Sequence, residues 1–85
     1  MRLSSEENKD MIERQIKLNE TKDVQEFVKE AGKCSFDIDI SYNRIIIDAK
    51  SLLGILSMDL TRELTVRCYG ESQRFNKVMD KFAIA

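Results

Sequence analysis

The spacing of apolar residues changes along this chain, and each spacing predicts a secondary-structure element. Between residues 11 and 18 apolar and polar residues alternate, with Arg14 as the one exception, and this period of two predicts a β-strand. The next apolar residues follow the spacing of an amphipathic helix: Val24, Phe27, Val28 and Ala31. We therefore expect a helix over about 22–32, with Gly32 at its C-terminal end.

A β-hairpin is predicted at the centre of the chain. Apolar and polar residues alternate over 36–42, as they do in a strand with one packed and one solvated face. A second apolar run at 45–48 supplies the partner strand. Asn43 lies between the two runs and tolerates the left-handed backbone conformation that tight hairpin turns require.

Three further elements complete the pattern. Residues 51–58 form a short apolar run that predicts a helix, and residues 64–69 alternate as a strand that ends at Gly70. A second amphipathic stripe follows near the end of the chain: Phe75, Val78, Met79 and Phe82. The predicted order of elements is therefore βαββαβα.

This order has a simple two-layer solution. Each strand has one apolar parity and each long helix has one apolar stripe, so a sheet with helices on one face would bury all of them. The predicted fold class is α+β, an open-faced sandwich in which three helices cover one face of a four-stranded antiparallel sheet. Residues 1–10 contain few large apolar groups, and we expect them to be a flexible N-terminal extension to a domain over 11–85.

Composition and charge narrow the possible functions. The 85 residues suffice for one domain with one modest core. The 14 Lys and Arg are interspersed with 15 Asp and Glu, so no basic surface for nucleic acid is predicted. No apolar run is long enough to span a membrane, and the first residues do not form a signal peptide. We therefore expect a cytoplasmic protein that binds neither nucleic acid nor membranes.

The sequence offers little for catalysis. It contains no histidine, which removes the commonest general base and the Ser-His and Cys-His nucleophile pairs. Asp37 and Asp39 share one face of a predicted strand, but without a third nearby ligand a solvated sheet surface is the favoured interpretation. Cys34 and Cys68 are expected to be free thiols that are buried or half-buried. We therefore predict a protein that is not an enzyme and holds no cofactor and no metal ion.

The stretch AKSLLGILS carries the strongest indication of a functional surface. Five of the seven residues that follow its first serine, Ser51, are large and apolar: Leu52, Leu53, Ile55, Leu56 and Met58. A two-turn helix cannot point all of them towards a sheet. We expect Ile55 and Met58 to face inward and the three leucines to form an apolar patch of the kind that binds a partner. The alternative is a short helix that is buried on all sides.

The same stretch resembles a motif of the HPr family, the histidine-containing phosphocarrier proteins of the bacterial sugar phosphotransferase system. The motif around the regulatory serine of that family has the form x-K-S-[IL]-[ML]-G-[VIL]-[ML]-S. This chain matches it at Lys50, Ser51, Leu52, Leu53, Gly54, Ile55, Leu56 and Ser57. The element order extends the resemblance to about residues 11–82, and the resemblance implies the HPr-like open-faced sandwich.

The chain departs from the family at the histidine that accepts the phosphoryl group. In the family this histidine lies in a G-[IL]-H-A-R-P segment at the start of the first helix, whereas this chain has LNETKDV at 18–24. Counting back from Ser51 without gaps places Glu20 at the histidine position and Lys22 at the arginine position. Aligning the first strands instead makes this loop several residues shorter than in the family, and neither alignment supplies a histidine. The resemblance therefore implies an HPr-like protein that cannot carry phosphohistidine.

The resemblance implies a role for the serine instead. In the Gram-positive branch of the family, a dedicated kinase phosphorylates this serine, and the product binds transcription or metabolic regulators. Carried over to this chain, that makes Ser51 a regulatory phosphorylation site beside a partner-binding surface. This surface would consist of Lys50, Leu52, Leu53 and Leu56. The partners would be proteins: HPr kinase, a transcription regulator or components of the phosphotransferase system.

Two other functions stay open. The chain could be a phosphocarrier that uses another acceptor near Glu20 or Thr21, although the sequence supplies no metal site or base to assist it. It could also be a relic or a structural subunit whose HPr-like surface has lost its partners.

Overall fold

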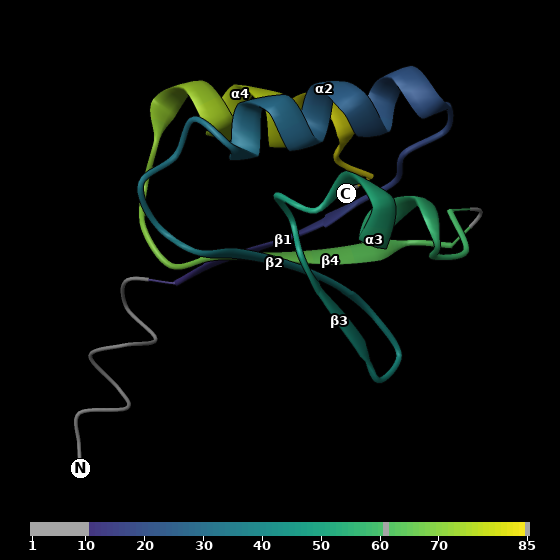
Figure 1. Cartoon of the computed structure of the whole chain (residues 1–85). Helices are drawn as coiled ribbons and strands as arrows, with labels where there is room; N and C mark the ends of the chain where they lie inside the picture. Colours follow the sequence, from purple (N-terminus) through teal and green to yellow (C-terminus); the bar gives the residue numbers. More distant parts are fainter. Residues whose placement is uncertain (1–10, 61, 85) are drawn as a thin grey trace, which may run out of the picture.

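The structure is a computed structural model that describes residues 11–60 and 62–84, and these form seven elements (Figure 1). The strands are β1 (Ile12–Ile16), β2 (Ile38–Tyr42), β3 (Ile45–Asp48) and β4 (Leu64–Cys68), and the helices are α2 (Thr21–Ala31), α3 (Leu52–Leu56) and α4 (Gln73–Phe82). The predicted order βαββαβα is confirmed. None of the described helices has the length and apolar composition that a membrane span requires. The predicted N-terminal extension, 1–10, lies outside the described residues.

The four strands form one antiparallel sheet in the order β1-β4-β2-β3. β4 is a central strand, because Cys68 lies opposite Ile12 of β1 on one side and opposite Ile38 of β2 on the other. Figure 1 shows α2 and α4 lying together over one face of the sheet, with α3 on the same side. The predicted open-faced sandwich is confirmed.

The hydrophobic core lies between the sheet and the helices. Its largest fully buried side chains include Phe27, Phe75, Ile16, Leu18, Ile38, Ile40, Ile55, Leu64 and Met79. The rings of Phe27 in α2 and Phe75 in α4 have centroids 5.4 Å apart, within the range of favourable aromatic pairs. This contact joins the two long helices directly over the sheet.

Arg14, the one polar residue on the inward parity of β1, is accommodated at the border of the core. It lies opposite Val66, and its guanidinium group forms an ion pair with Asp80 of α4. A long side chain can cover apolar surface with its aliphatic part and still place its charge at the surface. Arg14, which interrupts the apolar alternation of the first strand, therefore connects β1 to α4.

Three local features refine the sequence predictions. Ser41, which was expected on the solvated face, is only 7 % exposed because Thr65 and Ile46 lie opposite it on the two neighbouring strands. Gly32 ends α2 as predicted, but its φ of −65° is right-handed and makes no use of the left-handed freedom of glycine. Asn43 in the hairpin turn has the predicted positive φ, 57°.

Both cysteines are free, as predicted. Cys34 is half-buried and Cys68 is buried among core residues. Burial raises the pKa of the Cys68 thiol to about 11, so at neutral pH this thiol is protonated and a poor nucleophile.

Gly70 permits a close contact between the chain after β4 and Phe36. A Cβ atom added at Gly70 would lie 2.5 Å from the Phe36 ring, whereas at Gly32 the nearest atom would be 3.4 Å away. We expect Gly70→Ala to lower the free energy of unfolding by about 1–3 kcal/mol through overpacking. Gly32→Ala, the matched control, should leave it unchanged or raise it by about 0.4–1 kcal/mol. Urea denaturation measures both values, and equal effects of the two substitutions would contradict this account.

Candidate functional site

The candidate site consists of Ser51 and the short helix α3, and a tight turn after β3 positions it. The Ser51 N–H donates to the carbonyl oxygen of Asp48 at 2.9 Å, and the Lys50 N–H donates to the Asp48 carboxylate, also at 2.9 Å. These two hydrogen bonds turn the chain from the edge of the sheet towards the helical layer (Figure 1). The start of α3 is therefore held by the end of β3.

Ser51 caps α3. Its backbone is extended, and its Oγ accepts a hydrogen bond from the Gly54 N–H at 3.2 Å. This bond satisfies one of the amide groups that have no partner within the first turn of a helix. Ser51 is also exposed to solvent, so another protein can reach its hydroxyl group.

The apolar side chains of α3 and the residues after it divide between core and solvent. Ile55 is fully buried and Met58 nearly so, as predicted, whereas Leu53 is 81 % exposed and Leu56 is 38 % exposed. Leu52 is half-buried and packs against the core, which corrects the prediction that it faces outward with the other leucines. The reason is that Leu52 precedes Ile55 by three residues and so shares the inner side of the helix. The α3 patch, as we call Leu53 and Leu56, is the exposed part.

Gly54 allows α3 to approach β3. A Cβ atom at this position would lie 2.7 Å from Cγ2 of Ile47 and 2.9 Å from Oγ of Ser51. Real Cβ atoms do not come so close to other atoms, so a larger residue would displace either the helix or the serine cap. The glycine within the serine motif therefore has a steric role in this chain.

Lys50 has a structural contact in addition to its predicted place on the partner-binding surface. Its side-chain ammonium group donates a hydrogen bond to the carbonyl oxygen of Cys34 at 3.1 Å. This bond ties the chain after α2 to the start of α3. The Lys50 side chain is exposed, and an ammonium group has three donors, so donors remain for a partner.

The two residues that the ungapped count from Ser51 places at the histidine and arginine positions of the HPr motif lie at the start of α2. Glu20 is the N-cap residue of that helix, Lys22 lies in its first turn, and both are exposed. The carboxylate of Asp23 accepts hydrogen bonds from the N–H groups of Asn19 and Glu20, each at 3.1 Å. Although α2 and α3 pack together, no hydrogen bond or ion pair among the described residues joins Glu20 or Lys22 to Ser51.

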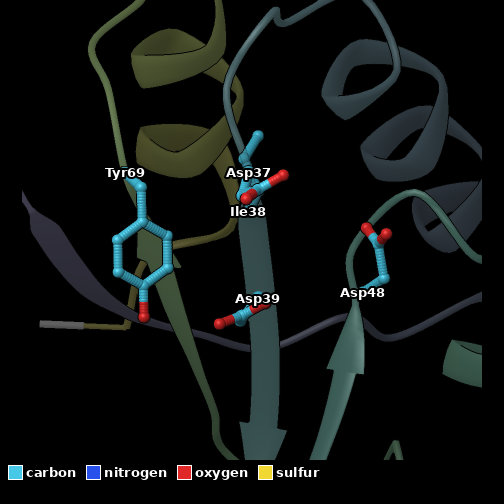
Figure 2. Close-up of a pocket in the computed structure, with 5 residues that line it drawn as sticks. All are labelled: Asp37, Ile38, Asp39, Asp48 and Tyr69. Carbon is cyan, nitrogen blue, oxygen red and sulfur yellow. The ribbon is translucent and has the colours of Figure 1, made fainter.

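A second concave feature lies at the start of β2 (Figure 2). The hollow has a volume of about 450 Å³ and is lined by Asp37, Ile38, Asp39, Asp48 and Tyr69. The prediction that Asp37 and Asp39 share a face is confirmed. Within the described part of the chain, no three acidic, cysteine or histidine side chains are grouped closely enough to hold a metal ion.

Comparisons with known proteins identify the fold. The sequence matches no family model and no curated protein sequence. The crystal structure of the phosphocarrier protein HPr from Bacillus anthracis is similar with a TM-score of 0.59 and 22 % identity, covering 86 % of this chain and 93 % of that one. The crystal structure of HPr-C-His from Thermoanaerobacter tengcongensis is similar with a TM-score of 0.61 and 23 % identity, covering 84 % and 86 %. The predicted HPr-like fold is confirmed.

The pKa of the Tyr69 hydroxyl group depends on the charges that line the hollow. Burial raises its pKa, the negative charge of Asp39 raises it further, and Arg67 opposes the increase. Since the carboxylate disfavours the phenolate, we expect Asp39→Asn to move the titration of Tyr69 to lower pH. Ultraviolet absorbance during an alkaline titration, in a Tyr42→Phe background, measures this change. Asp37→Asn should have a smaller effect, and an unchanged titration in the Asp39 variant would contradict the assignment.

Proposed function

We propose that this chain is a protein-interaction module with the HPr fold, which is regulated by phosphorylation of Ser51 and does not carry phosphohistidine. The observation that carries the proposal is the exposed serine at the start of α3 beside the exposed side chains of the α3 patch. The absence of histidine from the sequence argues against the phosphocarrier alternative. Such a module would act on protein partners in the bacterial cytoplasm.

Phosphorylation of Ser51 is compatible with the local hydrogen bonds. Among the described residues, the Ser51 hydroxyl group accepts a bond from the Gly54 N–H and donates none. Loss of its proton to a phosphoryl group would therefore break no bond of the fold. The phosphate would add about two negative charges at neutral pH, and its oxygens could accept from the same N–H group. We infer that α3 would stay folded and acquire a charge next to an apolar surface.

The α3 patch has the properties of a small docking surface. Leu53 has the highest exposure among the large apolar side chains described here, and Leu56 is exposed beside it on the same short helix. Removing such side chains from water stabilises a complex, and charged groups at the rim select the partner. A phosphate on Ser51 would supply that charge, so the same patch could bind different partners before and after phosphorylation.

We expect the purified chain to gain one phosphoryl group when it is incubated with an HPr kinase and ATP, and intact-mass analysis measures the gain. Ser51→Ala should gain none. Ser57→Ala, at the other end of α3, should still be modified, because the Ser57 hydroxyl donates to the Gly54 carbonyl oxygen at 2.6 Å. A chain that stays unmodified under conditions that modify a genuine HPr would refute the proposal. Transfer of label from phosphorylated enzyme I would favour the phosphocarrier alternative.

Leu53→Asp tests the α3 patch separately. Because Leu53 is exposed, the substitution should change the free energy of unfolding by no more than about 0.5 kcal/mol. We expect the rate of Ser51 phosphorylation and the retention of protein partners in pull-downs to fall about tenfold or more. The control is Tyr69→Ser, an exposed residue at the hollow. Equal rates of Ser51 phosphorylation for the wild type and Leu53→Asp would contradict a docking role. If pull-downs with the wild type and with Ser51→Asp both retain no partner, the relic or structural-subunit alternative would be favoured.

A further inference from the structure

The strand β3 forms the open edge of the sheet. The opposite edge, β1, is partly covered by the end of α4 and the residues after it. The Lys17 N–H donates to the Phe82 carbonyl oxygen at 3.0 Å, and the Ile84 N–H donates to the Gln15 carbonyl oxygen at 3.3 Å. In the part of the chain that the structure describes, no strand pairs with the outer side of β3, and the Asp48 carbonyl oxygen at its end accepts a hydrogen bond from the Ser51 N–H. Figure 1 shows this strand at the margin of the sheet, away from α2 and α4.

Apart from its shortness and the charges of Arg44 and Asp48, this edge lacks several of the features that usually prevent strands from pairing between molecules. Such features include proline, lysine, inward-pointing charges and bulges. The edge sequence, RIIID at 44–48, contains no proline and no lysine, and its register with β2 is continuous from Tyr42 opposite Ile45 to Asp39 opposite Asp48. Two side chains of the strand, Ile45 and Ile46, are 50 % and 63 % exposed. A partner strand would remove both from water.

The register of the hairpin determines which backbone groups of β3 point outward. The Ala49 N–H donates to the Ile38 carbonyl oxygen at 2.9 Å, so these two residues form a hydrogen-bonded pair. Hydrogen-bonded and non-hydrogen-bonded pairs alternate along an antiparallel ladder. Ile46 and Ser41, three pairs further along, are therefore a non-hydrogen-bonded pair. The N–H and C=O groups of Ile46 consequently point away from β2 and are free to pair with another strand.

We propose that two copies of this chain associate through their β3 strands, which pair antiparallel about a two-fold axis at Ile46. In this register Ile46 lies opposite Ile46 of the second copy, and Arg44 lies opposite Asp48 of the second copy on both sides of the axis. These three residues share one parity of the strand, so their side chains meet on the outer face of the sheet. Two four-stranded sheets then become one continuous sheet.

Charge complementarity selects this arrangement. Arg44 is exposed, and its guanidinium group has no ion-pair partner among the described residues. Asp48 uses one carboxylate oxygen for the Lys50 N–H, which leaves the other oxygen for a guanidinium group. A cation at one end of the strand and an anion at the other are self-complementary only when two strands run antiparallel. A parallel pair in register would place like charges side by side.

The interface is short, so the association should be weak. A strand of four residues buries much less than the roughly 1,600 Å² of a standard protein interface. We therefore expect dissociation constants in the range of roughly micromolar to millimolar. The experiment has to cover a wide concentration range.

Sedimentation velocity of the full chain over a concentration series tests the proposal, with a shift of the wild type from monomer to dimer as the expected result. Arg44→Glu or Asp48→Lys alone places like charges opposite each other in both flanking pairs, and each should weaken the dimer about tenfold or more. An equimolar mixture of these two variants restores opposite charges at both pairs. The mixture should therefore dimerise about as well as the wild type.

Two further variants separate pairing from folding. Ile46→Lys changes an exposed side chain on the axis and should give a folded monomer, which circular dichroism and thermal unfolding verify. Lys77→Glu reverses an exposed charge on α4 and should dimerise like the wild type. A wild type that stays monomeric at every concentration would overturn the proposal, as would a mixture that fails to restore association. Binding of an unrelated extended peptide at β3 without self-association would also overturn it.

Discussion

The contact between Phe27 of α2 and Phe75 of α4 holds the helical layer over the inner face of the sheet, and the other packing of the domain follows from it. Both rings are fully buried, and their centroids lie 5.4 Å apart. A chain of 85 residues has little other apolar surface with which to offset the loss of conformational entropy on folding. The sheet can therefore bury its apolar parity only where α2 and α4 cover it, and α3 has to use the remaining space beside α2 and over β3.

The position of α3 explains how a five-residue helix can form a functional surface. So short a helix has little stability of its own, so it depends on tertiary contacts. Ile55 anchors it in the core, Gly54 lets it approach Ile47 of β3, and Ser51 caps its first turn. With one side anchored in this way, the side chain of Leu53 is left in solvent. Core packing thus fixes the geometry of the surface on which the proposed function depends.

The HPr fold does not assign a function by itself, because one fold can serve several roles. The similar HPr structures share only 22 % and 23 % of their residues with this chain, so the likeness concerns the arrangement of the elements. The functional argument therefore depends on residues of this chain: a serine that is exposed and capping, an apolar patch beside it, and a sequence that contains no histidine. The two edges of the sheet also differ in this chain. The end of α4 and the residues after it cover part of β1, whereas no strand covers β3 in the described part of the chain.

The sequence by itself determined the seven elements and their order, because apolar residues that recur every two or every 3.6 positions show which side of a strand or helix is buried. The exposure of Leu53 also follows from that local geometry. Only the tertiary structure decided that Ser41 is covered by its cross-strand neighbours, that Leu52 leans into the core and that Lys50 binds the carbonyl oxygen of Cys34. Each of these features depends on residues that are distant in the sequence or on the exact placement of a short helix, and no local pattern of apolar residues contains that information.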